Sequence, residues 1–236
     1  MKKITWAATI AASLFTMQTA SAVDFNVQIT NLSNGIYYTP FLVAAHPDGT
    51  SLFTVGQPAS ASLQAMAEGG SIAGLSTDLQ AMGATIAENP AGGLLTPAAS
   101  TNVDLNTDGT SNVLLTVVAM LLPTNDAFAG LNAVSIPTTP GTYVFDVPAY
   151  DAGTEANDEL LVAGAGGAPG VPGMPGDPGG TTGMNGTGAA SADSNPNVHI
   201  HRGSLGDTNT AGGTSDLDSR IHRWLNPVIR IVVTVR

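Results

Sequence analysis

The chain has 236 residues, a formal net charge of −11 and no cysteine. Its basic residues lie only near the two ends: between Asp24 and His201 there are 15 aspartates and glutamates and no lysine or arginine. This charge argues against nucleic acid and anionic lipid surfaces as partners. The lack of cysteine excludes disulfides and a lipid anchor at a cysteine. Cations and basic surfaces fit better, although adaptation to a saline medium would produce the same composition.

Residues 1–22 have the features of a secretory signal peptide. Two lysines precede an apolar stretch from Ile4 to Met17, which is too short to span a bilayer. Ala20-Ser21-Ala22 matches the small-residue pattern of a cleavage site, so the mature protein is predicted to begin at Val23. We therefore expect a secreted protein, periplasmic or extracellular, with one domain over 23–236 and no transmembrane segment after cleavage.

Alternation of apolar and polar residues predicts strands along the chain. Phe25, Val27 and Ile29 alternate with polar residues, which is the period-two pattern of a half-buried strand. The segment Asn112–Leu122 is apolar on both faces, as expected for a strand that lies centrally in its sheet or is covered on its second side. Further strands are predicted at Thr39–Ala45, Thr142–Val147, Val198–His201 and Val228–Val235.

The pattern becomes helical between the second and third of these strands. Ala59–Glu68 and Ile72–Ile86 are rich in Ala, Leu, Gln and Met, and Leu63, Met66 and Ala67 have helical spacing. One or two short helices, separated by Gly69-Gly70, are therefore expected. Together the elements predict an all-β protein in which two packed antiparallel sheets carry a small helical excursion.

Residues 163–197 form a low-complexity segment rich in glycine and proline. Four consecutive G-X-P triplets between Gly167 and Pro178 are typical of collagen. Four triplets are too few for a stable triple helix, and the segment lies between strands that must pair. It is interpreted as a flexible surface loop with polyproline II character.

The segment Tyr150–Glu159 places four carboxylates around a glycine without a neighbouring cation. Upstream, Asp126 directly follows the end of a long apolar strand, and a connection through Ala127–Gly141 would return the chain to a neighbouring edge. Clustered carboxylates repel one another, and a Ca²⁺ ion with oxygen ligands would relieve the repulsion. Gly153 would permit the tight turn, and Asp158, backbone carbonyls or water would complete the coordination shell. The alternative is that these acids cap turns and face solvent.

Several segments carry a pattern found in a known family. They are Phe25–Ser33, Leu52–Gly56 with Ala67–Gly70, Met120–Gly130, Tyr150–Glu155, Val198–Gly203 and the closing strand. Together they resemble the spondin domain, the N-terminal module of F-spondin and mindin, in a bacterial single-domain form. The resemblance implies a C2-like antiparallel β-sandwich with a calcium site in the loops at one end. It places the metal ligands on Asp126, Asp151 and Glu155, and implies a role in extracellular adhesion.

A second metal hypothesis rests on His199 and His201. Two residues apart on a strand, they would point to one face, the H-x-H geometry of copper and zinc sites. Such a site needs three or four protein ligands, and no motif brings in His46 or His222. The alternative is that these are ordinary polar strand positions. The motifs of serine hydrolases, zinc proteases and P-loop proteins are absent from the sequence.

These observations lead to one main functional hypothesis and two alternatives. The main one is a secreted, calcium-binding β-sandwich that acts as a non-enzymatic binding or adhesion module. Its partner would be an extracellular protein or glycan surface. The alternatives are an exported copper or zinc metalloenzyme that uses the histidine pair, and a purely structural envelope protein.

Overall fold

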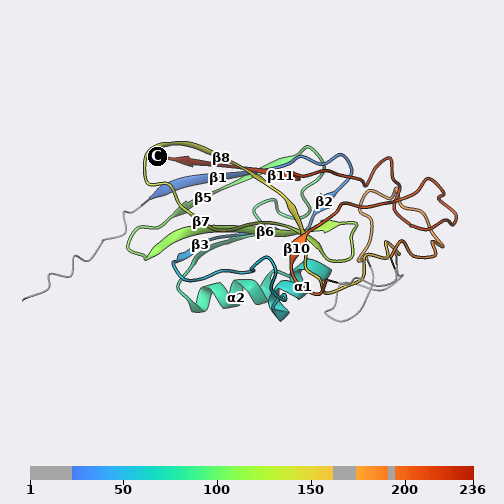
Figure 1. The fold of residues 1–236 in the computed structure, drawn as a ribbon. Helices are drawn as coiled ribbons and strands as arrows, with labels where there is room; N and C mark the ends of the chain where they lie inside the picture. Colours follow the sequence, from blue (N-terminus) through green and yellow to red (C-terminus); the bar gives the residue numbers. More distant parts are fainter. Residues whose placement is uncertain (1–22, 162–173, 191–194) are drawn as a thin grey trace, which may run out of the picture.

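The computed structural model describes residues 23–161, 174–190 and 195–236. The predicted signal peptide lies outside these ranges. Two antiparallel sheets pack face to face, and two short helices cover the outer side of the second sheet (Figure 1). The prediction of an all-β antiparallel sandwich with a small helical excursion is confirmed.

The first sheet has four strands in the order β5-β1-β11-β8. The strands are β1 (Asp24–Asn31), β5 (Ser100–Asn106), β8 (Gly141–Val147) and β11 (Ile229–Val235). The first and last strands of the domain are neighbours, with Phe25 opposite Val235. Phe25, Val27 and Ile29 are fully buried between the sheets, as the alternating pattern predicted.

The second sheet runs in the order β10-β9-β7-β6-β3-β4, and the short strand β2 also pairs with β6. The strands are β2 (Tyr37–Tyr38), β3 (Leu42–Pro47), β4 (Thr85–Glu88), β6 (Asn112–Leu122), β7 (Ala127–Ser135), β9 (Ala149–Asp151) and β10 (His199–Ile200). Strand β6 has the predicted bounds and is covered on both sides. Val117 belongs to the core between the sheets, and Met120 belongs to a second core under the helices.

The helices α1 (Ala61–Gly69) and α2 (Ala73–Ala81) form the third layer. The hydroxyl of Ser60 caps α1 by accepting a hydrogen bond from the Leu63 N–H, and Gly70 ends the helix in the left-handed conformation at φ 69°. Leu63 and Met66 are fully buried against the second sheet, as their spacing predicted.

Two predicted elements are wrong in their extent. The strand predicted at Thr39–Ala45 begins only at Leu42, because Pro40 lacks the N–H that a central strand needs. The helix predicted over Ile72–Ile86 ends at Ala81. Gly83 then adopts φ 82° and turns the chain back, so that β4 pairs with β3.

The connection predicted through Ala127–Gly141 is also wrong, because its first nine residues form β7. Strand β7 consists largely of small residues, and one of them is required by packing. A Cβ atom on Gly130 would lie 2.7 Å from the Phe53 ring. The small residues make this strand difficult to recognise from the sequence. They also allow an aromatic ring from the β3–α1 connection to pack on it.

The glycine- and proline-rich segment connects two strands that pair with each other, β9 and β10. Residues 163–173 and 191–194 of the segment, with most of the G-X-P triplets, lie outside the described ranges. In its described part the Gly183 N–H donates to the Asp216 carbonyl, and the Gly188 N–H donates to the Thr214 carbonyl. This part therefore packs against the segment that precedes β11. Its flexibility stays a prediction.

Candidate metal centre

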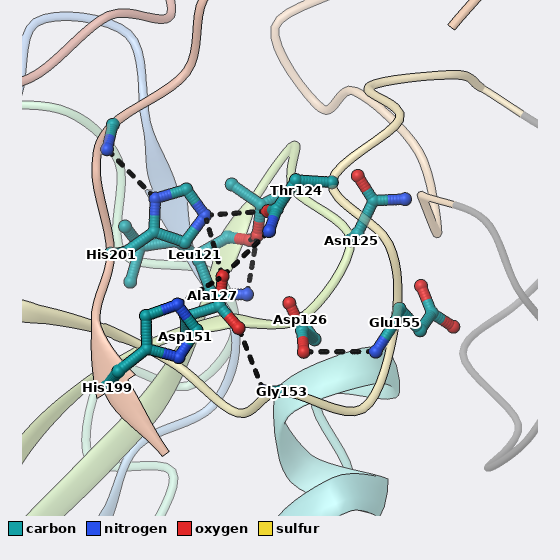
Figure 2. A network of polar contacts seen from close by, with 12 residues as sticks. Leu121, Thr124, Asn125, Asp126, Ala127, Asp151, Gly153, Glu155, His199 and His201 are labelled. Atoms are coloured by element: carbon teal, nitrogen blue, oxygen red, sulfur yellow. Dashed lines mark hydrogen bonds and ion pairs between the residues drawn. The ribbon is translucent and has the colours of Figure 1, made fainter. Parts of the chain in front are cut away.

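Strand pairing brings Asp126 and Asp151 to the same end of the second sheet. Asp126 lies in the short turn between β6 and β7, directly before Ala127. Ala127 is opposite Asp151, the last residue of β9, and Asp151 is in turn opposite His199 of β10. The two carboxylates therefore meet because β9 pairs with β7 (Figure 2). Strand β7 lies within the predicted connection Ala127–Gly141, so this segment brings the carboxylates together as a strand and not as a loop.

The Asp126 side chain is fully buried, and only one of its carboxylate oxygens is hydrogen bonded. Oδ2 accepts hydrogen bonds from the backbone N–H of Thr154 (2.8 Å) and of Glu155 (3.2 Å). Oδ1 has no hydrogen-bond partner in the described part of the chain. Burial and, to a smaller extent, the charge of Asp151 raise the pKa of Asp126 to about 7, although the bonds from Thr154 and Glu155 oppose the shift. A buried carboxylate oxygen without a hydrogen-bond donor is a suitable ligand for a hard cation.

The Asp151 carboxylate is also buried, and it is held from several sides. Oδ1 accepts a hydrogen bond from the Gly153 N–H at 2.8 Å, and Oδ2 accepts one from Asn157 Nδ2 at 2.7 Å. The Nε2 atoms of His199 and His201 lie 3.7 Å and 3.9 Å from the same Oδ2. Asp151 is therefore fixed in position beside Asp126.

Glu155, the third predicted ligand, reaches Asp126 through its backbone and not through its carboxylate. Its N–H donates to Asp126, while Figure 2 shows its carboxyl group turned to the other side of the chain. Among the described residues, no three His, Cys, Asp and Glu side chains are grouped closely enough to hold a metal ion. The structure thus brings together two of the three predicted ligands, Asp126 and Asp151.

The remaining carboxylates of the acidic segment hold neighbouring loops. Asp158 Oδ1 accepts hydrogen bonds from Asn125 Nδ2 at 3.0 Å and from the Leu160 N–H at 3.1 Å. The buried Glu159 carboxylate accepts hydrogen bonds from the backbone of Leu205 and Gly206 and from the Ser215 hydroxyl. Glu159 therefore anchors the segment that precedes β11.

The predicted orientation of the histidine pair is confirmed, because His199 and His201 approach the same oxygen of Asp151. Both ring nitrogens of His201 have hydrogen-bond partners. Nδ1 accepts from the Gly203 N–H at 3.0 Å, so Nε2 carries the proton and donates to Asn157 Oδ1 at 2.9 Å. The Nδ2 atom of the same Asn157 side chain donates to Asp151 Oδ2. His201 thus orients the Asp151 carboxylate through an amide.

The chemistry of this pair of buried carboxylates would suit a hard divalent cation. Asp126 has an unpartnered buried oxygen, and it makes no ion pair with an arginine in the described ranges. Asp126 and Asp151 would supply the anionic ligands. Calcium takes about six to eight oxygens, so backbone carbonyls and water would supply the others. Bound there, the cation would offset the repulsion between the two carboxylates.

Sequence reasoning missed Thr154 and Asn157, which position the two carboxylates. Their polar side chains lie inside the acidic segment, yet their partners depend on how that segment folds. The D-x-G spacing did give a signal. The Asp151 carboxylate accepts from the N–H two residues on, a local bond by which aspartates stabilise turns.

Replacing Gly153 with alanine is expected to destabilise the protein by roughly 2 kcal/mol or more. Gly153 has φ 71°, and a Cβ atom there would lie 2.7–2.8 Å from the backbone of Asn195, Pro196 and Asn197. Chemical denaturation of the variant measures the loss. Gly109→Ala is the matched control, because Gly109 has φ 69° with open space around it. Equal losses in both variants would contradict the close approach at Gly153.

Within the described ranges, no helix has the length and apolar character needed to cross a membrane. A comparison with curated proteins found no match to this chain. The model of the Spondin_N family matches residues 18–160, which include Asp126, Asp151 and Glu155. The match ends before the histidine pair and β11, so it covers less of the chain than the resemblance in sequence suggested. More than half of the chain is matched, and the chain therefore belongs to the spondin N-terminal domain family, whose members are extracellular modules.

Proposed function

We propose that this chain is an exported, calcium-binding β-sandwich that acts as a binding or adhesion module without catalytic activity. The observation that carries the proposal is the buried Asp126 carboxylate, which has one unpartnered oxygen and lies beside a second buried carboxylate. The features of a signal peptide in residues 1–22 support export. Membership of the spondin N-terminal domain family supports an extracellular setting.

Calcium would add a further link between two elements that strand pairing and the hydrogen bonds of Thr154 and Glu155 to Asp126 already join. Asp126 belongs to the β6–β7 turn, and Asp151 ends β9 and begins the acidic segment. A cation between them would fix this end of the sandwich and the loop that follows. The ordered loop surface would then bind an extracellular protein or a glycan surface.

Thermal melting of residues 23–236 tests the metal part of the proposal. Relative to chelator, saturating calcium is expected to raise the melting temperature by about 5–10 °C, because a ligand at 100 times its Kd adds about 2.7 kcal/mol. Magnesium, zinc and copper are measured in parallel. A rise with zinc or copper alone would contradict the calcium site and favour the metalloenzyme that uses His199 and His201. No shift with any of the four metals would contradict a metal site.

The binding role needs a separate measurement. Labelled protein is applied to arrays of extracellular-matrix proteins and of glycans, once with calcium and once with chelator. Binding that requires calcium and is lost in Asp126→Asn supports the adhesion module. If calcium stabilises the protein but no surface retains it, the binding role is contradicted and a purely structural envelope protein is favoured.

A further inference from the structure

Strand β8 is an open edge of the first sheet. In the part of the chain that the structure describes, its only neighbour in the sheet is β11. Alternate N–H and C=O groups along its outer side therefore have no strand to pair with. Its central residue, Val144, points outward and is 55% exposed, while Tyr143 and Phe145 are half-buried at the rim of the core. Strand β8 thus combines unpaired backbone hydrogen-bonding groups with apolar side chains that are exposed or half-buried.

The other sheet edges are protected in ways that β8 is not. Strand β5, at the opposite edge of the same sheet, has only polar side chains among its exposed residues: Ser100, Asn102, Asp104 and Asn106. The second sheet ends in β4 and β10, which have only four and two residues. Short strands and outward charges are common means of blocking strand addition. Strand β8 has seven residues, like β5, but its central residue, Val144, is apolar and exposed. Its one charged residue, Asp146, pairs with Arg230 at 2.7 Å, as Asp104 of β5 pairs with Arg236 at 2.8 Å.

The sequence of β8 is complementary to itself in antiparallel pairing. Two copies of β8 can be aligned antiparallel so that their Val144 residues lie opposite each other. All seven residues from Gly141 to Val147 then have a partner, and side chains that face the core in one copy lie beside side chains that face the core in the other. Val144 then lies opposite Val144 of the second copy, and Tyr143 lies opposite Phe145. Asp146 lies opposite Thr142, so no two like charges face each other.

We propose that the β8 edge is a self-association surface, on which a second copy of this chain adds its own β8 in antiparallel register around a two-fold axis. The two four-stranded sheets would then form one continuous sheet. The inference goes beyond the proposed calcium-binding function, because β8 contains neither Asp126 nor Asp151.

The assembly is expected to stop at two copies. Pro140 and Pro148 directly flank β8 and limit the pairing to these seven residues, since proline cannot donate to a ladder. In the pair, the β8 edge of each copy is occupied by the other copy, and the continuous sheet has a polar β5 strand at each of its two edges. A closed pair follows, and a fibre does not.

Pairing of one strand buries little area, so association should be weak. Two acidic molecules also repel each other, and salt should strengthen the pair by screening this repulsion. Sedimentation from about 1 to about 500 µM covers dissociation constants in the micromolar range. The average mass of residues 23–236 is expected to rise toward that of two chains, and to rise at lower concentration in higher salt.

Val144→Lys tests the surface, because a lysine on the edge would place two positive charges opposite each other. This variant is expected to stay a single chain at all concentrations with an unchanged melting temperature. Asn102→Lys, the matched control in the middle of the β5 edge, should associate like the wild type. A wild type that stays a single chain throughout overturns the proposal. Association that persists in Val144→Lys overturns it as well.

The absence of cysteine in the chain allows a direct test of the register. In the proposed pair residue 144 faces its own copy, so Val144→Cys should be joined rapidly into dimers by a short thiol cross-linker. Asn102→Cys should react only at the rate of random collisions. Equal rates for the two variants would place the contact elsewhere and overturn the proposal.

Discussion

Asp126→Asn is expected to abolish stabilisation by calcium and, in chelator at pH 8, to make the protein more stable than the wild type. At that pH the wild type holds a buried carboxylate beside Asp151 against its tendency to take up a proton. Asparagine removes this charge. Its carbonyl oxygen can still accept from the Thr154 and Glu155 N–H groups, and its NH₂ group can face the side of Oδ1. The gain should be on the order of 1–3 kcal/mol.

Chemical denaturation in chelator and in calcium measures both effects for each protein. Asp104→Asn is the control, because Asp104 is exposed and its pKa is lowered, first by the Asn26 hydrogen bond and then by Arg236. It should lose a little stability in both conditions and keep the response to calcium. If Asp126→Asn proves much less stable than the wild type in chelator, the Asp126 carboxylate has a partner that calcium does not explain.

Without calcium, the stability of the wild type relative to Asp126→Asn is expected to fall as pH rises from about 4 to about 7. The pKa of Asp126 is about 7 in the folded protein and near its ordinary value of 3.8 when unfolded. Between these values the folded protein holds a proton that the unfolded chain has released, so raising the pH favours unfolding. The slope is at most about 1.4 kcal/mol per pH unit. The fall should end above about pH 7.

Comparison of the two proteins isolates Asp126 from other titrating groups. Burial lowers the pKa of His46 and of His222, so these histidines make the protein more stable as pH rises toward 6.5. They are present in both proteins, and their effect cancels in the difference. Calcium binding should show the opposite trend to Asp126, with an affinity that rises up to about tenfold per pH unit below 7 and then levels off. A difference between the proteins that does not change from pH 4 to 8 would contradict the raised pKa.

The parts of the fold that could be predicted are those where side chains report burial directly. Strand β1 alternates cleanly because one face is core and the other is solvent, and β6 is apolar on both faces over most of its length because helices cover its second face. Strand β5 was missed because it is a polar edge strand, and β9 because it has three residues. Their pairing depends on partners far away in the sequence. Local composition does not contain that information.

The candidate site shows the same division. Asp126 and Asp151 could be found because each follows a stretch predicted as a strand and has no basic residue nearby in the sequence, and the structure places them together. The direction of the Glu155 side chain follows from the turn at Gly153, whose geometry depends on contact with residues 195–197. Sequence spacing put Glu155 within reach of the site. It could not show that the backbone N–H, and not the carboxylate, makes the contact.

The pairing of β1 with β11 also determines when the domain can fold. Strand β11 lies between β1 and β8 in the first sheet, yet it is the last of all the elements to leave the ribosome. Until it emerges, β8 has no partner in that sheet, and the core between the two sheets lacks one of its walls. The growing chain therefore remains incompletely folded until synthesis of the domain ends. In the export that we propose, this late closure would keep the polypeptide unfolded until its synthesis is complete.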